Sequence, residues 1–242
     1  MTLQRYVAVQ EEVVDAASSA DYERWIKHLV RTRYENPSGR GTWQAGKHNQ
    51  SYYYVFPIDS LNDVGLESRF QLWFQGVSET HSQEAAQVAA LPISGVRSTR
   101  LSVLERMEKY SYSPSTSVVR APMFAFVDVH QVRADMQDQY DALVTSLVEA
   151  MRKVEYPFAW SAFRTIIGEG RTFYGPPRTY HYVVFFESMY QFFEEHWFGA
   201  AMGKALGTEG ARQYSDTEKK CLQGFENFTC KLRSDLSYSP PQ

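Results

Sequence analysis

The chain has 242 residues, a formal net charge of −3 and 43% hydrophobic residues, the composition of an ordinary globular protein. This composition excludes collagen, coiled coils, disordered tails and disulfide scaffolds. The slightly acidic balance, with no run of basic residues, argues against a nucleic-acid partner. Aromatic residues make up 15% of the chain, which suits large packed interfaces or a ligand cavity.

The sequence also predicts where the protein works. The longest unbroken apolar stretch is about as short as residues 182–186, so no membrane span is expected. The first residues lack the apolar core of a signal peptide. Cys221 and Cys230 form at most one disulfide, and we expect both as reduced thiols. These features together predict a cytoplasmic protein without a membrane partner.

The two halves of the chain repeat the same features in the same order. Residues 110–114 and 236–240 share four of five residues. Apolar helical stripes begin at Tyr22 and at Tyr140, 118 positions apart, and a strand-like segment precedes each at the same offset. The aromatic segments 52–56 and 180–184 follow in the same order. We interpret the chain as one unit written twice, with predicted domains at 1–115 and 122–242 and a linker at 116–121.

Each half is predicted to run strand, helix, strand, strand, helix, strand. In the first half we expect strands near 4–14, 42–48, 51–58 and 100–112, a helix from Ser18, a second helix over 60–72 and a helical piece over 82–90. In the second half we expect strands near 123–132, 159–167, 180–187 and 225–238, helices near 135–154 and 188–206, and a further helix over 208–223. This order is the ferredoxin-like βαββαβ arrangement, an α+β fold with helices on one face of an antiparallel four-stranded sheet.

Two such units, each with an apolar sheet face and an aromatic strand that ends in an acid–Ser step, resemble the dimeric α+β barrel superfamily. The two steps are Asp59-Ser60 and Glu187-Ser188. This superfamily includes antibiotic-biosynthesis monooxygenases, NIPSNAP-like proteins and, in tandem form, chlorite dismutase-like heme proteins. The resemblance covers nearly the whole chain and rests on the order of elements. It implies two ferredoxin-like sheets packed as an α+β barrel, a pseudo-dimer within one chain that also allows a homo-oligomer.

The strand over 123–132 supplies the first candidate site residues. Small residues such as Val127 alternate with Phe126, Asp128 and His130, so the two sets point to opposite faces of the sheet. We expect the small residues beneath the helices and Asp128 and His130 on the open face. There Asp128 is predicted to orient His130 as a catalytic general base. The alternative is that both are solvated or form structural hydrogen bonds at the barrel mouth.

Four residues are candidates for ligand binding. Arg164 shares a strand face with Trp160, where it is suited to bind a ligand carboxylate or to stack on the ring. His181 lies in an aromatic strand, and its counterpart in the first half is Tyr53, which suggests that the position needs a ring. With Phe126 and Tyr182, these residues are predicted to contact a substrate. Packing in a core or interface is the alternative.

The sequence predicts neither a metal site nor a cofactor. The six histidines show no metal-ligand spacing, and no phosphate-binding loop or nucleophile elbow is present. In the tandem heme proteins that the chain resembles, the ligand histidine lies toward the end of the first helix of the second repeat. Residues 149–154 occupy that stretch here and contain no histidine. His196, on an apolar helix face, leaves heme binding as an alternative.

The prediction for function is a protein that binds a small apolar or aromatic molecule in a barrel or sheet–helix pocket. The resemblance implies a cofactor-independent monooxygenase-like or isomerase-like enzyme in which Asp128 and His130 assist proton removal. The alternatives are a non-catalytic binding or stress-response module, whose aromatic residues are core, and a heme-binding protein. The sequence leaves open whether the protein is an enzyme.

Overall fold

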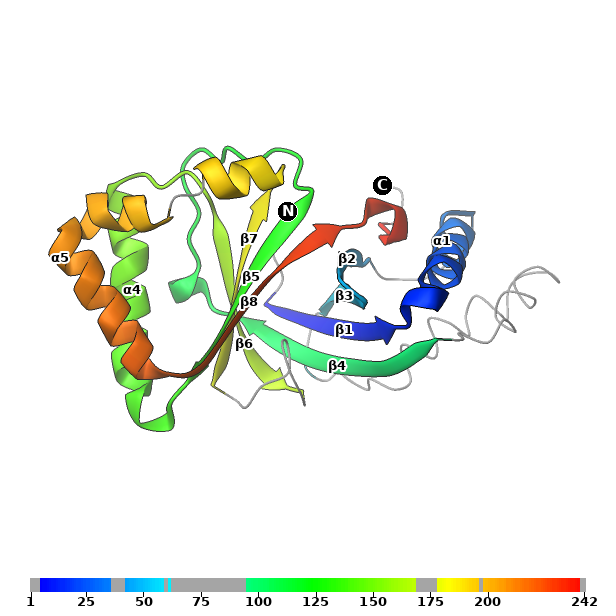
Figure 1. Cartoon of the computed structure of the whole chain (residues 1–242), viewed down its shortest axis with the longest axis horizontal. Helices are drawn as coiled ribbons and strands as arrows, with labels where there is room; N and C mark the ends of the chain where they lie inside the picture. Colours follow the sequence, from blue (N-terminus) through cyan, green and yellow to red (C-terminus); the bar gives the residue numbers. More distant parts are fainter. Residues whose placement is uncertain are drawn as a thin grey trace. The chain divides into compact units, whose positions relative to one another are not determined.

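The computed structural model describes residues 5–35, 42–58, 61, 95–168, 178–195 and 198–239 (Figure 1). The helices expected within 60–72 and 82–90, and residues 169–177 of the predicted loop, lie outside this set apart from residue 61. The chain divides into two compact units, unit 1 from residues 1–101 and 232–242 and unit 2 from residues 102–231. The predicted domain limits are those of a sequence repeat and stay a prediction. No helix in the described ranges is long and apolar enough to cross a membrane.

The described residues of unit 1 form a sheet with the helix α1 packed on it. Its strands follow the order β4-β1-β3-β2, and β3 pairs antiparallel with both of its neighbours. The helix α1 packs Tyr22 and Ile26 against the aromatic strand β3, because these positions form one apolar stripe at helical spacing. The elements of this unit are β1 (Tyr6–Val14), a 3₁₀ turn (Ala16–Ser18), α1 (Ser19–Glu35), β2 (Gln44–His48), β3 (Ser51–Ile58), the start of β4 (Val96–Arg106) and a 3₁₀ turn (Ser234–Leu236).

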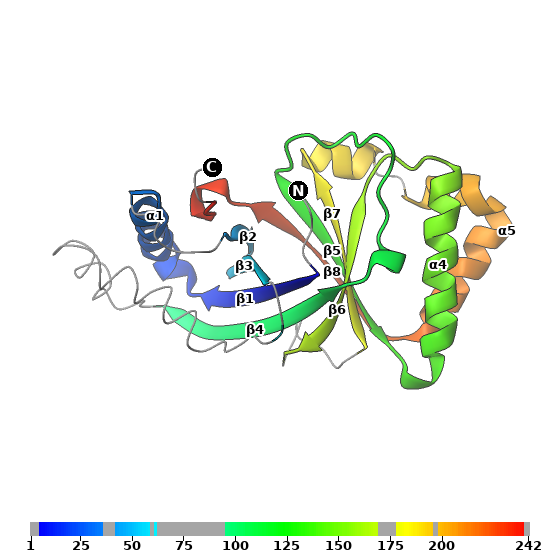
Figure 2. The same cartoon turned by 180° about the vertical axis from the view of Figure 1, so that it is seen from behind.

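Unit 2 is a larger sheet with two long helices on one face. Its strand order is β8-β5-β7-β6-β4, with antiparallel pairing throughout. The helices α4 and α5 lie side by side against this sheet (Figures 1 and 2). The elements are the end of β4, 3₁₀ turns at Glu108–Tyr110 and Ala134–Met136, β5 (Phe124–Val132), α4 (Gln137–Lys153), β6 (Trp160–Ile167), β7 (Thr179–Phe186), a π-helical turn (Gln191–Glu195), α5 (Phe198–Cys221) and β8 (Leu222–Leu232).

Among the described residues, the elements follow the predicted order, and their bounds differ most at the two repeated segments and in the helices expected over 188–206 and 208–223. The strands expected over 100–112 and 225–238 end earlier, at Arg106 and Leu232, and a 3₁₀ turn follows each. Side-chain hydrogen bonds explain the early ends, because the hydroxyl of Ser111 accepts the Ala162 N–H and the hydroxyl of Ser237 accepts the Ala45 N–H, each at 2.9 Å. The two segments therefore have matching structures in the two units.

The helices expected over 188–206 and 208–223 are joined in the structure. A π-helical turn covers Gln191–Glu195, and α5 then runs from Phe198 to Cys221. Gly207 interrupts α5 with a φ of 73°, a left-handed conformation that glycine adopts without steric cost. The predicted separation between the two helices thus corresponds to a kink at Gly207. Cys221, at the end of α5, and Cys230 are buried free thiols, as expected.

The prediction of which face of β5 lies beneath the helices was wrong. Phe126, Asp128 and His130 face α4 and α5, and the small residues, including Val127, face the other way. The same holds in unit 1, where Glu12 of β1 contacts Tyr22 of α1. The physical reason is that large rings fill the wide space between a sheet and its helices, where helix hydroxyls also provide partners for polar side chains.

Candidate functional site

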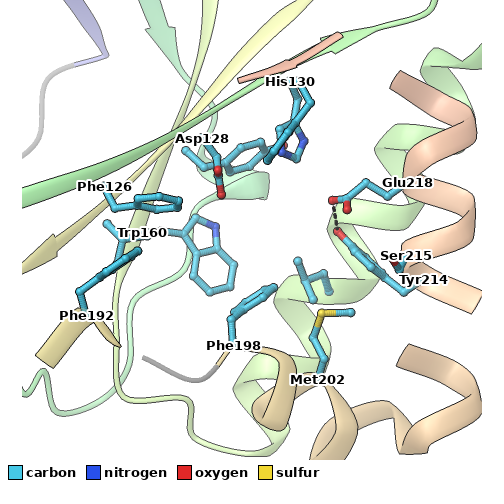
Figure 3. Close-up of a pocket in the computed structure, with 14 residues that line it drawn as sticks. Phe126, Asp128, His130, Trp160, Phe192, Phe198, Met202, Tyr214, Ser215 and Glu218 are labelled. Carbon is cyan, nitrogen blue, oxygen red and sulfur yellow. Dashed lines mark hydrogen bonds between the residues drawn. The ribbon is translucent and has the colours of Figure 1, made fainter. Parts of the chain in front are cut away.

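A cavity of about 380 Å³ lies between the sheet of unit 2 and its two helices (Figure 3). This volume is within the range of pockets that hold small-molecule ligands. Most of the wall is apolar and aromatic, and a few polar groups point into it. The lining residues are Phe126, Asp128, His130, Leu147, Trp160, Tyr182, Val184, Phe192, Phe198, Met202, Tyr214, Ser215, Glu218 and Phe225.

Local sequence patterns position the polar groups of this cavity. Asp128 and His130 are two residues apart on β5, so their side chains leave the same face of the strand. Tyr214 and Glu218 are four residues apart on α5, so they share one helix face. The kink at Gly207 separates this part of α5 from Met202, and both parts of the helix line the cavity. Strand and helix thus present their polar groups from opposite walls, as Figure 3 shows for Asp128 and Glu218.

Asp128 is the most perturbed acid in this cavity. Its Oδ1 atom is buried, and no described residue donates a hydrogen bond to it. Burial raises the pKa of Asp128 to about 7, and the negative charge of Glu218 adds to the shift. A carboxyl group with a pKa near 7 exchanges its proton readily at neutral pH. This is the property required of a general acid or base.

Glu218 is the second acid of the cavity. The hydroxyl of Tyr214 donates a hydrogen bond to its Oε1 at 3.4 Å. Burial also raises the pKa of Glu218, while the Tyr214 hydrogen bond and the charge of Lys219 oppose the shift. Two carboxyl groups therefore share one poorly solvated space, where each disfavours ionisation of the other.

His130 belongs to a chain of hydrogen bonds between the sheet and α4. Its Nδ1 lies 2.9 Å from the hydroxyl of Tyr140, which lies 2.7 Å from the hydroxyl of Tyr182. Burial lowers the pKa of His130 to about 4, so the imidazole is neutral at physiological pH. The interactions of His130 differ from the expected ones, since its ring nitrogen contacts Tyr140 and no described hydrogen bond joins it to Asp128.

The predicted ligand-binding residues fall into two groups. Phe126 and Tyr182 line the cavity together with Asp128 and His130. Arg164 does not line it and instead pairs with Glu105 through its Nη2 at 2.7 Å. His181 is on the opposite face of β7, fully buried, with its Nε2 2.8 Å from the Thr165 hydroxyl. Burial lowers the pKa of His181 to about 3. The structure therefore brings four of the six candidates together.

Sequence reasoning missed the wall that α5 provides. Residues 208–223 were recognised as a helix but given no role, although Tyr214 and Glu218 have the spacing of one helix face. The available signal in the sequence was an acid, Glu218, on the same helix face as an aromatic residue, Tyr214. Trp160 was noted only as a possible stacking partner. It is 6% exposed and lines the cavity, while its indole N–H donates to the Tyr110 carbonyl at 2.7 Å.

Comparison with known proteins identifies the fold. No protein-family model and no curated protein matches the chain. The solved structures that match include a "putative monooxygenase" from Lactobacillus acidophilus NCFM, with 9% identity, a TM-score of 0.51, and 97% of this chain and 95% of that chain covered. An anthrone oxidase-like protein matches at 13% identity with a TM-score of 0.53, covering 95% of this chain and 91% of that chain. Chlorite dismutase from Candidatus Nitrospira defluvii matches at 12% identity with a TM-score of 0.51 and the same coverage.

The chain has the α+β barrel fold of these proteins. At 9–13% identity, the likeness shows the fold alone. The fold agrees with the predicted resemblance to the dimeric α+β barrel superfamily. What the neighbours do therefore enters only as support for a proposal about this chain.

The residues of this cavity do not fit a heme group. The two propionates of heme are anionic, whereas the described lining residues that carry charge are the acids Asp128 and Glu218, with no lysine or arginine among them. His130 is the one histidine that lines the cavity. Residues 149–154, the stretch in which the resemblance implies a ligand histidine, carry none, and His196 lies outside the described residues. Among the residues that the structure describes, no cluster of three or more potential metal ligands is found.

Proposed function

We propose that the cavity of unit 2 binds a small, largely aromatic molecule and that Asp128 removes a proton from it. The observation that carries this proposal is the buried Oδ1 of Asp128, which faces an apolar cavity of about 380 Å³ without a hydrogen-bond partner among the described residues. A carboxyl group raised to a pKa of about 7 is a stronger base than an ordinary aspartate and is still ionised in part at neutral pH. The monooxygenase and anthrone oxidase-like neighbours support a reaction of this class.

The proposed first step is removal of a proton from a carbon next to a carbonyl group. The proton moves to Asp128, and the electron pair of the broken C–H bond moves onto the carbonyl oxygen, giving an enolate. In this arrangement Tyr140 donates to Nδ1 of His130, so that the imidazole proton is on Nε2 and available to the enolate oxygen. His130 is then an electrophilic partner, and Asp128 is the base. This assignment replaces the predicted one, in which Asp128 only oriented His130.

Two outcomes can follow from the enolate. Return of the proton to another carbon gives an isomerisation. Reaction with dioxygen places one oxygen atom on the substrate carbon, and the second oxygen leaves as water with two hydrogens of the substrate. For anthrone, this balance gives anthraquinone and water. The proposal concerns the shared first step, proton removal.

We also propose that the fold is a tandem pair of ferredoxin-like units within one chain. The strand order β8-β5-β7-β6 supports this, since it repeats the order β4-β1-β3-β2 with equivalent strands at each place. The matched hydrogen bonds of Ser111 and Ser237 support it as well. On this proposal the chain is a pseudo-dimer, and the two candidate sites within it have diverged.

Hydrogen exchange of an enolisable probe tests the proposed base. Anthrone is incubated with the full chain in anaerobic D₂O buffer, and loss of its methylene proton signal is followed by NMR against a buffer control. We expect the protein to accelerate exchange, Asp128→Asn to lower the acceleration about 100-fold and His130→Ala about tenfold. Asp138→Asn, which removes an exposed acid of α4 outside the cavity, is the matched control and should exchange at the unmodified rate.

Two results would contradict this function. One is an unmodified protein that binds anthrone without accelerating exchange, which would favour the non-catalytic binding module. The other is an Asp128→Asn variant that retains the full rate, which would place the base elsewhere. Thermal denaturation of each variant shows whether a lower exchange rate comes from loss of the base or from unfolding of the protein. If His130→Ala loses most of its stability together with its activity, the histidine has a structural role.

A further inference from the structure

Among the described residues that line the cavity of unit 2, the side chains that carry charge are all acidic. Asp128 and Glu218 are the lining side chains that carry charge. His130 is neutral because burial lowers its pKa to about 4, and burial raises the pKa values of Tyr182 and Tyr214, which keeps both phenols neutral. A ligand therefore meets negative charge or none, and an anionic ligand would be repelled.

The two acids repel each other in the absence of a ligand. They approach from opposite walls, Asp128 from β5 and Glu218 from α5 (Figure 3), and the charge of Glu218 raises the pKa of Asp128. The charge of Lys219 lowers the pKa of Glu218, but its side chain is exposed to solvent and does not line the cavity. A positive group placed between the two carboxylates would relieve this repulsion and provide a partner for Asp128 Oδ1.

The remaining wall suits a cation as well. Aromatic rings surround the two acids, and the face of an aromatic ring attracts a positive charge. Trp160, the ring type with the strongest attraction, lines the cavity together with Phe198, and the centroids of the two rings are 6.2 Å apart. Acids combined with aromatic rings are the lining expected of a site for an organic ammonium group.

We propose that the ligand of this cavity carries a protonated amine, which lies between the carboxylates of Asp128 and Glu218 and against the surrounding aromatic rings. This inference rests on the proposed function and narrows its substrate class to amine-bearing aromatic molecules. Glu218 holds the ammonium group, and the nearby positive charge keeps Asp128 ionised, the form that accepts a proton. The amine therefore binds the substrate to Glu218 and also keeps the carboxyl group of Asp128 deprotonated.

Three probes with a shared naphthalene ring test the proposal. They are 2-(naphthalen-2-yl)ethylamine, the corresponding ethanol and naphthalen-2-ylacetate, which are a cation, a neutral molecule and an anion at pH 8. Calorimetric titration of the full chain should give an affinity for the amine about tenfold higher than for the alcohol, with the acetate weakest. Glu218→Gln should lower the amine affinity to that of the alcohol. Asp216→Asn, which removes an exposed charge of the same helix outside the cavity, should leave the preference unchanged.

A pH series on the unmodified protein gives a second readout that does not depend on a variant folding. The amine is cationic throughout the range from pH 8 to pH 5.5, and Asp128 takes up its proton near pH 7. We therefore expect the amine affinity to fall about tenfold over this range while the alcohol affinity stays constant. The neutral groups that face the acids, His130, Tyr182 and Tyr214, do not change charge between these values.

The results separate the two proposals. Binding of the alcohol with no preference for the amine, or a preference for the acetate, overturns the amine inference and leaves the proposed function standing. An amine preference that persists in Glu218→Gln and is independent of pH also overturns it. Failure of all three probes to bind overturns the ligand cavity itself, and with it both proposals.

Discussion

The two units contain similar hydrogen-bonded chains between sheet and helix, and these chains differ in their first residue. In unit 2 the chain runs from His130 to Tyr140 to Tyr182. In unit 1 it runs from Glu12 to Tyr22 to Tyr54, from the equivalent strand, helix and strand, and the two tyrosine hydroxyls are again 2.7 Å apart. What the two units share here is a hydrogen-bonded contact between sheet and helix, and the first residue of each chain differs in its chemistry.

The residue before each chain separates the two units. In unit 1 the amide of Gln10 donates to the carboxylate of Glu12, so the polar groups satisfy one another. In unit 2 the equivalent residue is Asp128, whose Oδ1 has no described partner and faces a cavity. A buried cluster whose polar groups all have hydrogen-bond partners contributes to stability. A cluster with an unpartnered polar atom can form a hydrogen bond with a ligand. We infer that unit 1 has a structural cluster and unit 2 a functional one.

Glu12→Leu should have the largest effect on stability of the variants that test this comparison. The substitution leaves the Gln10 amide without its acceptor and takes one partner from the Tyr22 hydroxyl in a buried site. We expect a loss of about 3 kcal/mol in the free energy of unfolding, measured by urea denaturation. His130→Leu removes a partner from one hydroxyl only and should cost about 1 kcal/mol. Equal losses would show that the unit 1 cluster is no more structural than that of unit 2.

The pH dependence of stability should distinguish Asp128 from its counterpart. The folded-state pKa of Asp128 is about 7, above its ordinary value of 3.8, so the folded protein binds more protons than the unfolded chain between these values. Asp128 alone therefore contributes a fall in the free energy of unfolding as the pH rises from 4 to 7, whereas the lowered pKa values of His130 and His181 contribute a rise over the lower part of this range. We expect Asp128→Asn to remove about 3 kcal/mol of this contribution from Asp128.

The control for this measurement is Gln139→Asn, which changes an exposed amide of α4 outside the cavity and should follow the pH profile of the unmodified protein. Denaturation midpoints at pH 4, 5.5, 7 and 8 provide the comparison. A profile of Asp128→Asn parallel to that of the unmodified protein would mean that Asp128 has an ordinary pKa. In that case the proposed base loses its physical support.

The sequence predicted the strands and the helices α1 and α4 because their signals are local. Apolar residues at helical spacing identified α1 and α4, and alternation identified β5. Alternation distinguishes the two faces of β5 but not which face lies beneath the helices, and that assignment failed. The large rings and the polar ends of Asp128 and His130 lie under α4 and α5, a tertiary outcome that depends on the volume between layers.

The sequence predicted the residues of the candidate site that lie on neighbouring strands, but it did not predict those that depend on long-range packing. Asp128, His130, Phe126 and Tyr182 come from adjacent strands whose neighbours follow from strand order, so the sequence indicated their proximity. Glu218 comes from the part of α5 that follows the interruption at Gly207, and the sequence pattern does not show that this part lines the cavity. The role of Arg164 depended on its partner, and its ion pair with Glu105 on β4 is not visible in the sequence pattern. Long-range contacts of this kind are set by the packed fold.

Paired tyrosine substitutions give the smallest effect and the most direct comparison. Tyr54→Phe and Tyr182→Phe each remove the last hydroxyl of one chain and leave the middle tyrosine bonded to Glu12 or His130. Since the deleted hydrogen bond is equivalent, we expect each to lower the free energy of unfolding by about 1 kcal/mol, within error of the other. Only Tyr182 lines the cavity, so only Tyr182→Phe should alter the affinity for the naphthalene probes. Equal effects on binding from both variants would mean that the two clusters do not differ in function.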